Sequence, residues 1–165
     1  HRDLHSFPTR RSSDLLAEFL SDPRVIELPR LLWKIILHGI VLRTRPAKSA
    51  RAYQSVWTED GSPLLAISRQ QQAAISKALG TEVPVALGMR YGNPSVSQAL
   101  RELQQQKVDR LIVLPLYPQY SGPTTGSVFD AVTEELRTWR YVPEIHFIQN
   151  YVIHDIFFYV IALTC

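Results

Sequence analysis

The second half of the chain alternates between two hydrophobic periods, and this alternation limits the folds open to it. Short apolar runs with strand character occupy residues 82–91, 109–120 and 144–151. Segments with apolar residues at helical spacing follow the first two runs, at 95–108 and 124–140. A final apolar segment, 154–163, follows the third. Strands that alternate with helices in this order predict an α/β fold, a doubly wound parallel sheet with helices on both faces.

The first half of the chain favours helices. Residues 16–22 predict a short amphipathic helix, and residues 22–42 predict a second helix that Gly39 loosens or ends. A polar, basic stretch follows and is expected to be part loop and part helix. The clearest helix spans 62–80, where Ser62 is the expected N-cap, Pro63 the first helical residue and Gly80 the stop signal.

The first fifteen residues are expected to lie outside the fold. Residues 1–15 show no apolar periodicity, and they match the translation of a DNA string that looks like a common sequencing-library adapter. We therefore expect residues 1–15 to be a disordered artefact and residues 16–165 to be one domain that lacks its first strand.

Composition argues against several classes of protein. The formal net charge is only +3 and no Lys/Arg-rich run occurs, so no nucleic-acid partner is expected. The single cysteine, Cys165, allows no intrachain disulfide and fits a reducing compartment, which leads us to expect a cytoplasmic protein. The longest apolar run, 156–163, is too short to span a bilayer, and the N-terminus has no signal-peptide apolar region.

Two polar loops follow predicted strands, at 88–95 and 117–127. Ligands of open parallel sheets bind beyond the carboxyl ends of the strands, and a helix N-terminus there suits an anion. The residues alone support a purely structural role for the second loop about as well as a ligand-binding role. In the structural interpretation the glycines and prolines shape the loop, Thr124 or Thr125 caps the helix, and the tyrosines pack. Neither loop carries a phosphate-binding fingerprint. The histidines His38, His146 and His154 are each expected to have a structural role or to bond to solvent.

Four segments together resemble the ferrochelatases, the enzymes that insert ferrous iron into a porphyrin during haem biosynthesis. They are LSDPRVIELPRLLW (20–33), VWTEDGSPLLAISRQQQ (56–72), VPVALGMRYGNPSV (83–96) and the signature loop LPLYPQYSGPTTGSVFDAV (114–132). The resemblance is to the bacterial protoporphyrin type and covers about 16–163. It implies a flavodoxin-like fold of two similar halves around a porphyrin cleft, of which this chain would be the first.

The resemblance implies that the chain is an incomplete, inactive half of a lyase that converts protoporphyrin IX and ferrous iron to protohaem. The opening strand and the C-terminal half-domain, with the family's catalytic histidine and glutamate, would lie outside it, so no catalytic or metal-binding residue is expected here. Gly122 stands where some relatives place a cluster-binding cysteine, so no iron–sulfur cluster is expected. A non-enzymatic flavodoxin-like module that binds a phosphate or carboxylate at the 124–127 helix start remains the alternative.

The same resemblance implies a set of substrate-binding residues. Arg45 and Lys48 would face porphyrin propionates, although a solvated loop is the commoner fate of such charges. Arg90 and Tyr91 would lie on the metal-entry side of the pocket. The implied cleft residues are Arg45, Lys48, Tyr53, Ser62, Arg90, Tyr91, Tyr117, Ser121, Thr124 and Thr125.

Overall fold

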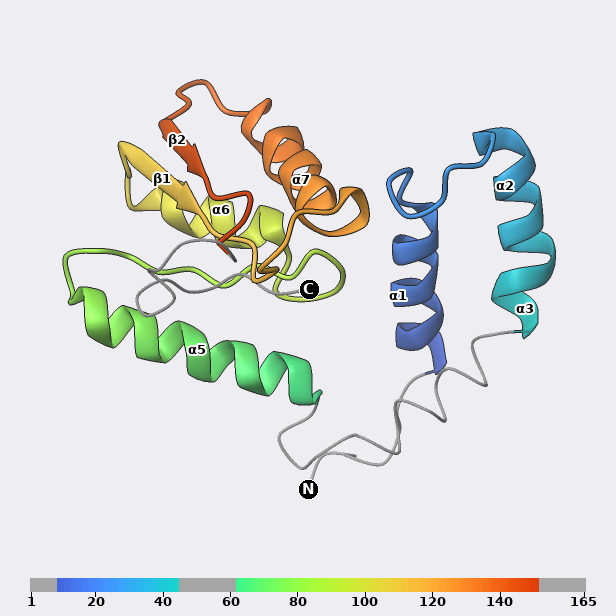
Figure 1. The fold of residues 1–165 in the computed structure, drawn as a ribbon, viewed down its shortest axis with the longest axis horizontal. Coiled ribbons are helices and arrows are strands. Elements are labelled where there is room, and N and C mark those ends of the chain that lie inside the picture. The colour runs from blue at the N-terminus through green and yellow to red at the C-terminus, as the bar shows by residue number, and fades with distance from the viewer. Residues whose placement is uncertain (1–8, 45–61, 152–165) are drawn as a thin grey trace. The chain divides into compact units, whose positions relative to one another are not determined.

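The computed structural model describes residues 9–44 and 62–151, which form two compact units divided after Pro63 (Figure 1). The expected final segment, 154–163, lies outside the described residues. Each unit is described by itself below. None of the helices in the described ranges is long and apolar enough to cross a membrane.

The described part of the first unit is helical. It contains α1 (Thr9–Ser21), α2 (Arg30–Ile36), the π-helix η1 (Leu37–Val41) and α3 (Leu42–Thr44). The indole Nε1 of Trp33 on α2 donates a 2.6 Å hydrogen bond to the carbonyl oxygen of Leu20, which ties α2 to the end of α1. Helix α1 starts inside the segment 1–15 that the sequence predicts to be disordered. Gly39 does not end the second helix, because the chain continues through η1 into α3.

The second unit opens with α5 (Pro63–Leu79), where the sequence predicts it. Pro63 is the first helical residue, and Gly80 ends the helix with a φ of +80° that favours glycine. The Nε2 of Gln72 on this helix donates to the carbonyl oxygen of Val85, 2.9 Å away. That bond holds α5 to the extended segment that follows it.

Two parallel strands form the sheet, β1 (Arg110–Val113) and β2 (Glu144–Phe147). Their register pairs Leu111 with Ile145 and Val113 with Phe147. The parallel sheet in a mixed α/β fold confirms the predicted class. In the described part of the chain, one face of the sheet carries the core, because Leu111 and Val113 are buried whereas Ile112 points the other way and is 62% exposed.

Helices α6 (Val96–Gln105) and α7 (Ser127–Leu136) pack against each other and supply the rest of that core (Figure 1). Ser95 begins α6 with a capping box, in which its hydroxyl accepts from the N–H of Gln98 and the Gln98 side chain accepts from the N–H of Ser95. The buried cluster contains Val96, Leu100, Leu111, Val113, Val128, Val132 and Leu136. It positions the loops that enter both helices.

The strand expected within 82–91 is the main difference from the sequence analysis. Residues 84–88 run without helical structure, but in the part of the chain described here they pair with no strand, and only the bridge between Met89 and Ser95 forms. A strand needs the backbone of a neighbour as well as a suitable sequence. The described sheet therefore has two strands, and α6 and α7 cover one of its faces.

Candidate functional site

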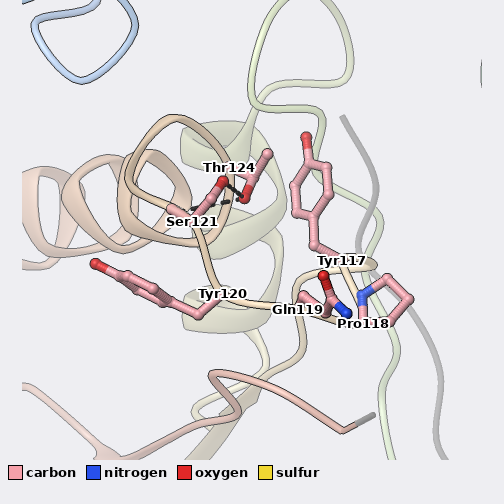
Figure 2. Close-up of a pocket in the computed structure, with 6 residues that line it drawn as sticks. All are labelled: Tyr117, Pro118, Gln119, Tyr120, Ser121 and Thr124. Carbon is pink, nitrogen blue, oxygen red and sulfur yellow. Dashed lines mark hydrogen bonds between the residues drawn. The ribbon is translucent and has the colours of Figure 1, made fainter.

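A cavity of about 430 Å³ opens in the loop that follows β1 (Figure 2). Its wall is a continuous piece of chain with one later residue, and it consists of Tyr117, Pro118, Gln119, Tyr120, Ser121 and Thr124. The cavity therefore lies beyond the carboxyl end of a parallel strand, the place where open α/β sheets bind ligands. Phenol, amide and hydroxyl groups beside a proline ring give the wall both apolar and hydrogen-bonding character.

The wall is shaped by a π-helical turn, η2 (Gly122–Gly126), that runs directly into α7. The Ser121 and Thr124 hydroxyls share a short hydrogen bond, and the Thr124 hydroxyl also donates to the Ser121 carbonyl oxygen at 3.3 Å (Figure 2). The N–H of Gly126 donates to the same carbonyl at 3.1 Å. Neither η2 nor α7 has a side-chain cap, so the predicted capping role of Thr124 or Thr125 is wrong.

The second polar loop, 88–95, meets this turn at Ser127. The Nε of Arg90 donates to the Ser127 hydroxyl at 2.6 Å and to its carbonyl oxygen at 3.0 Å. The Tyr91 hydroxyl shares a 3.3 Å hydrogen bond with the Ser127 hydroxyl, and the Arg90 guanidinium carbon lies 4.7 Å from the centre of the Tyr91 ring. The two loops that the sequence places after different strands are thus joined.

The start of the 88–95 loop is fixed by a close backbone approach. A Cβ on Gly88 would lie 2.9 Å from the Val96 Cα and 3.3 Å from the Ala99 Cβ, so only glycine fits against α6 here. The N–H of Met89 donates to the Pro94 carbonyl at 2.7 Å, and the N–H of Val96 donates to the Met89 carbonyl at 3.2 Å. These bonds close the loop that carries Arg90 and Tyr91.

The structure separates the predicted site residues into groups. Tyr117, Ser121 and Thr124 line the cavity, and Arg90 and Tyr91 meet the same loop at Ser127. Thr125 does not line the cavity and has no exposed surface, and its hydroxyl has no hydrogen-bond partner among the described residues.

Four predicted residues are not placed at the cavity. Ser62 belongs to the first unit, while Arg45, Lys48 and Tyr53 lie outside the described residues. Three residues that the structure places at the site, Gln119, Tyr120 and Ser127, were not among the predicted site residues. Gln119 and Tyr120 stand in the same loop as the chosen residues, which is the signal that could have found them.

Among the described residues, the side chains that line the cavity carry no formal charge. The N–H of Tyr151 donates to the Pro118 carbonyl at 3.1 Å, and burial raises the pKa of the Tyr151 phenol above its usual value. His38 and His146 are both exposed. Residues 9–44 and 62–151 contain no group of three or more His, Cys, Asp and Glu side chains that could hold a metal ion.

An ion pair supports α7 behind the site. The Nε of Arg101 on α6 donates to Oε1 of Glu135 at 2.8 Å, and its second nitrogen donates to Oε2 at 3.2 Å. Trp139 adds a third hydrogen bond to Oε1 at 3.4 Å. The hydrogen bond from Arg101 is the main reason that the pKa of the buried Glu135 carboxyl lies below its usual value.

Comparison with known proteins gives one family throughout. The ferrochelatase family model matches residues 10–164. A protein named ferrochelatase 2 from Shewanella oneidensis is 63% identical over 143 residues, covering 85% of this chain and 43% of the relative. Ferrochelatases from Shewanella denitrificans and Nitrosococcus oceani are 57% and 56% identical, each over 90% of this chain and over 46% and 41% of their own lengths.

The chain spans less than half the length of these curated relatives. Its match begins at residue 10 and runs through both site loops to residue 164, so it includes the cavity wall and the Ser127 junction. The resemblance found in the four sequence segments is confirmed, and the chain belongs to the ferrochelatase family as a part of a longer family member.

Proposed function

We propose that the protein to which this chain belongs inserts ferrous iron into protoporphyrin IX to form protohaem, and that this chain supplies one wall of the porphyrin cleft. The cavity lined by Tyr117, Ser121 and Thr124 carries the proposal, because it lies in the signature loop that links the chain to the family. Iron is the substrate of this reaction. We propose that the chain itself holds no iron–sulfur cluster, since Gly122 stands where some relatives have cysteine.

The cavity wall has the chemistry that a flat macrocycle requires. Tyr117 and Tyr120 offer ring faces, and the Ser121 and Thr124 hydroxyls are already oriented by their own hydrogen bond. A wall that is ordered before binding loses little conformational entropy when the ligand arrives. It can also favour a distorted macrocycle over a flat one, and distortion exposes a pyrrole nitrogen to the metal.

The proton acceptor for the reaction belongs to another part of the enzyme in this proposal. His38 and His146 lie far from the cavity wall in sequence and neither lines it. We therefore expect the 165-residue chain to form no haem by itself. Incubation of the purified chain with ferrous iron and porphyrin under reducing conditions, followed by Soret absorbance, tests this. Haem formation above a heat-denatured control would contradict it.

The decisive test uses the full-length protein encoded by the complete gene. Porphyrin consumption and haem formation are followed by fluorescence and absorbance in wild type, Tyr120→Ala and Tyr141→Ala. Both tyrosines are exposed, at 52% and 64%, but only Tyr120 lines the cavity. We expect Tyr120→Ala to raise the porphyrin KM by about three- to tenfold, since an aromatic contact contributes about 0.5–1.5 kcal/mol. Tyr141→Ala is expected to match wild type.

The non-enzymatic alternative remains distinguishable. A module that binds a phosphate or carboxylate at the start of α7 would respond to phosphate and nucleotide rather than to porphyrin. Titration of the chain with porphyrin separates the two, because binding would shift the porphyrin's Soret band, whereas a module specific for phosphate or carboxylate anions would leave that band unchanged. We further propose a cytoplasmic location, which fractionation of cells that express the full-length protein tests.

A further inference from the structure

Ser127 is a fully buried serine whose hydroxyl forms hydrogen bonds with side chains from a distant part of the sequence. It has no exposed surface, and its Oγ contacts Arg90 Nε at 2.6 Å and the Tyr91 hydroxyl at 3.3 Å. Its carbonyl oxygen accepts a second bond from the same Nε at 3.0 Å. One residue therefore anchors two neighbouring side chains of the 88–95 loop.

A helix-capping role does not account for this hydroxyl. Ser127 stands at the first position of α7, yet neither η2 nor α7 is capped by a side-chain hydrogen bond. A hydroxyl that caps a helix stabilises it by accepting a hydrogen bond from a backbone N–H of the first turn. Here the hydroxyl points instead to the arginine and the tyrosine of the other loop.

The anchoring position lies next to the cavity wall. Thr124 lines the cavity and Ser127 follows it by less than one helical turn, so both belong to the η2–α7 junction. Because the core holds Val128 and Val132 of α7, this junction cannot move independently of the sheet. Arg90 and Tyr91 are thereby held at a defined place relative to the wall.

We propose that Ser127 is a positioning residue, which orients Arg90 and Tyr91 relative to the cavity wall formed by Ser121 and Thr124. The inference rests on the proposed function, because it assigns Ser127 an effect on catalysis through Arg90. Loss of the hydroxyl leaves the carbonyl acceptor in place, so the Arg90 side chain is loosened rather than released.

The test measures haem formation by the full-length protein, per folded molecule as judged by circular dichroism. We expect Ser127→Ala to lower kcat/KM about tenfold, which corresponds to about 1.4 kcal/mol. Ser127→Cys keeps the shape of the side chain with a somewhat larger atom but offers only a weak sulfur acceptor, so a similar loss is expected. Ser127→Thr keeps the hydroxyl but adds a methyl group at a fully buried position, so it should recover part of the activity. Ser68→Ala is the matched control, since Ser68 is equally buried but bonds the Leu64 carbonyl within α5.

A double-mutant cycle distinguishes positioning from simple structural support. Arg90→Lys keeps the charge but removes Nε, and the double variant with Ser127→Ala should lose less activity than the product of the two single losses, because the bond from Arg90 can be lost only once. Losses that multiply in the double variant would show that Ser127 does not act through Arg90. If the full-length wild type is active but Ser127→Ala and Ser127→Cys both leave kcat/KM unchanged, this inference alone is overturned. Inactive full-length wild type would overturn the proposed function and this inference with it.

Discussion

Substitution of Gly88 by alanine tests whether the close approach between the first site loop and α6 stabilises the unit. The added Cβ would lie 2.9 Å from the Cα of Val96, a distance at which one of the two backbones has to shift. Movement of α6 is opposed by three buried residues, Val96, Ala99 and Leu100. Extra volume in a well-packed region usually costs about 1–3 kcal/mol, and we expect a value near the middle of that range.

The assay is equilibrium unfolding of the chain in urea, followed by circular dichroism. With a slope of about 2 kcal/mol per M, a loss of about 2 kcal/mol lowers the midpoint by about 1 M. Gly122→Ala is the matched control, because nothing lies within 4 Å of its added Cβ, and its midpoint should stay near that of wild type. A Gly88→Ala midpoint within about 0.2 M of wild type would refute the steric reasoning.

Three further predictions concern the ion pair, the first unit and the basic segment. The lowered pKa of Glu135 means that its stabilising effect is complete above the pKa of the unfolded carboxyl and is lost as pH falls through the lower pKa of the folded state. Glu135→Gln should therefore flatten the acid side of the stability–pH curve; an unchanged curve would contradict this. Trp33→Phe removes the hydrogen bond to Leu20 and should cost about 1 kcal/mol in urea unfolding, whereas no loss would argue against that tie. In the full-length protein, changing Arg45 and Lys48 to alanine should raise the KM for a dicarboxylate porphyrin about tenfold but not for its diester; equal effects would remove both residues from propionate binding.

Local sequence determined the helices with strong end signals. The proline at the start of α5 and the glycine after it mark its bounds, and the capping pair Ser95 and Gln98 marks the start of α6. These signals act within one or two turns of chain, so they need no tertiary context. The position of both site loops could be predicted from the apolar runs that precede them, whereas the family was predicted from the resemblance of four longer segments.

Tertiary structure decided the features that depend on distant partners. The 84–88 segment has strand-like composition but pairs with no strand among the described residues, because a ladder requires a second backbone. Thr124 and Thr125 are neighbours of similar chemistry, yet Thr124 lines the cavity and Thr125 is fully buried. The packing of α7 against the sheet sets that difference, and the same packing places Ser127 under Arg90, 37 residues away in sequence.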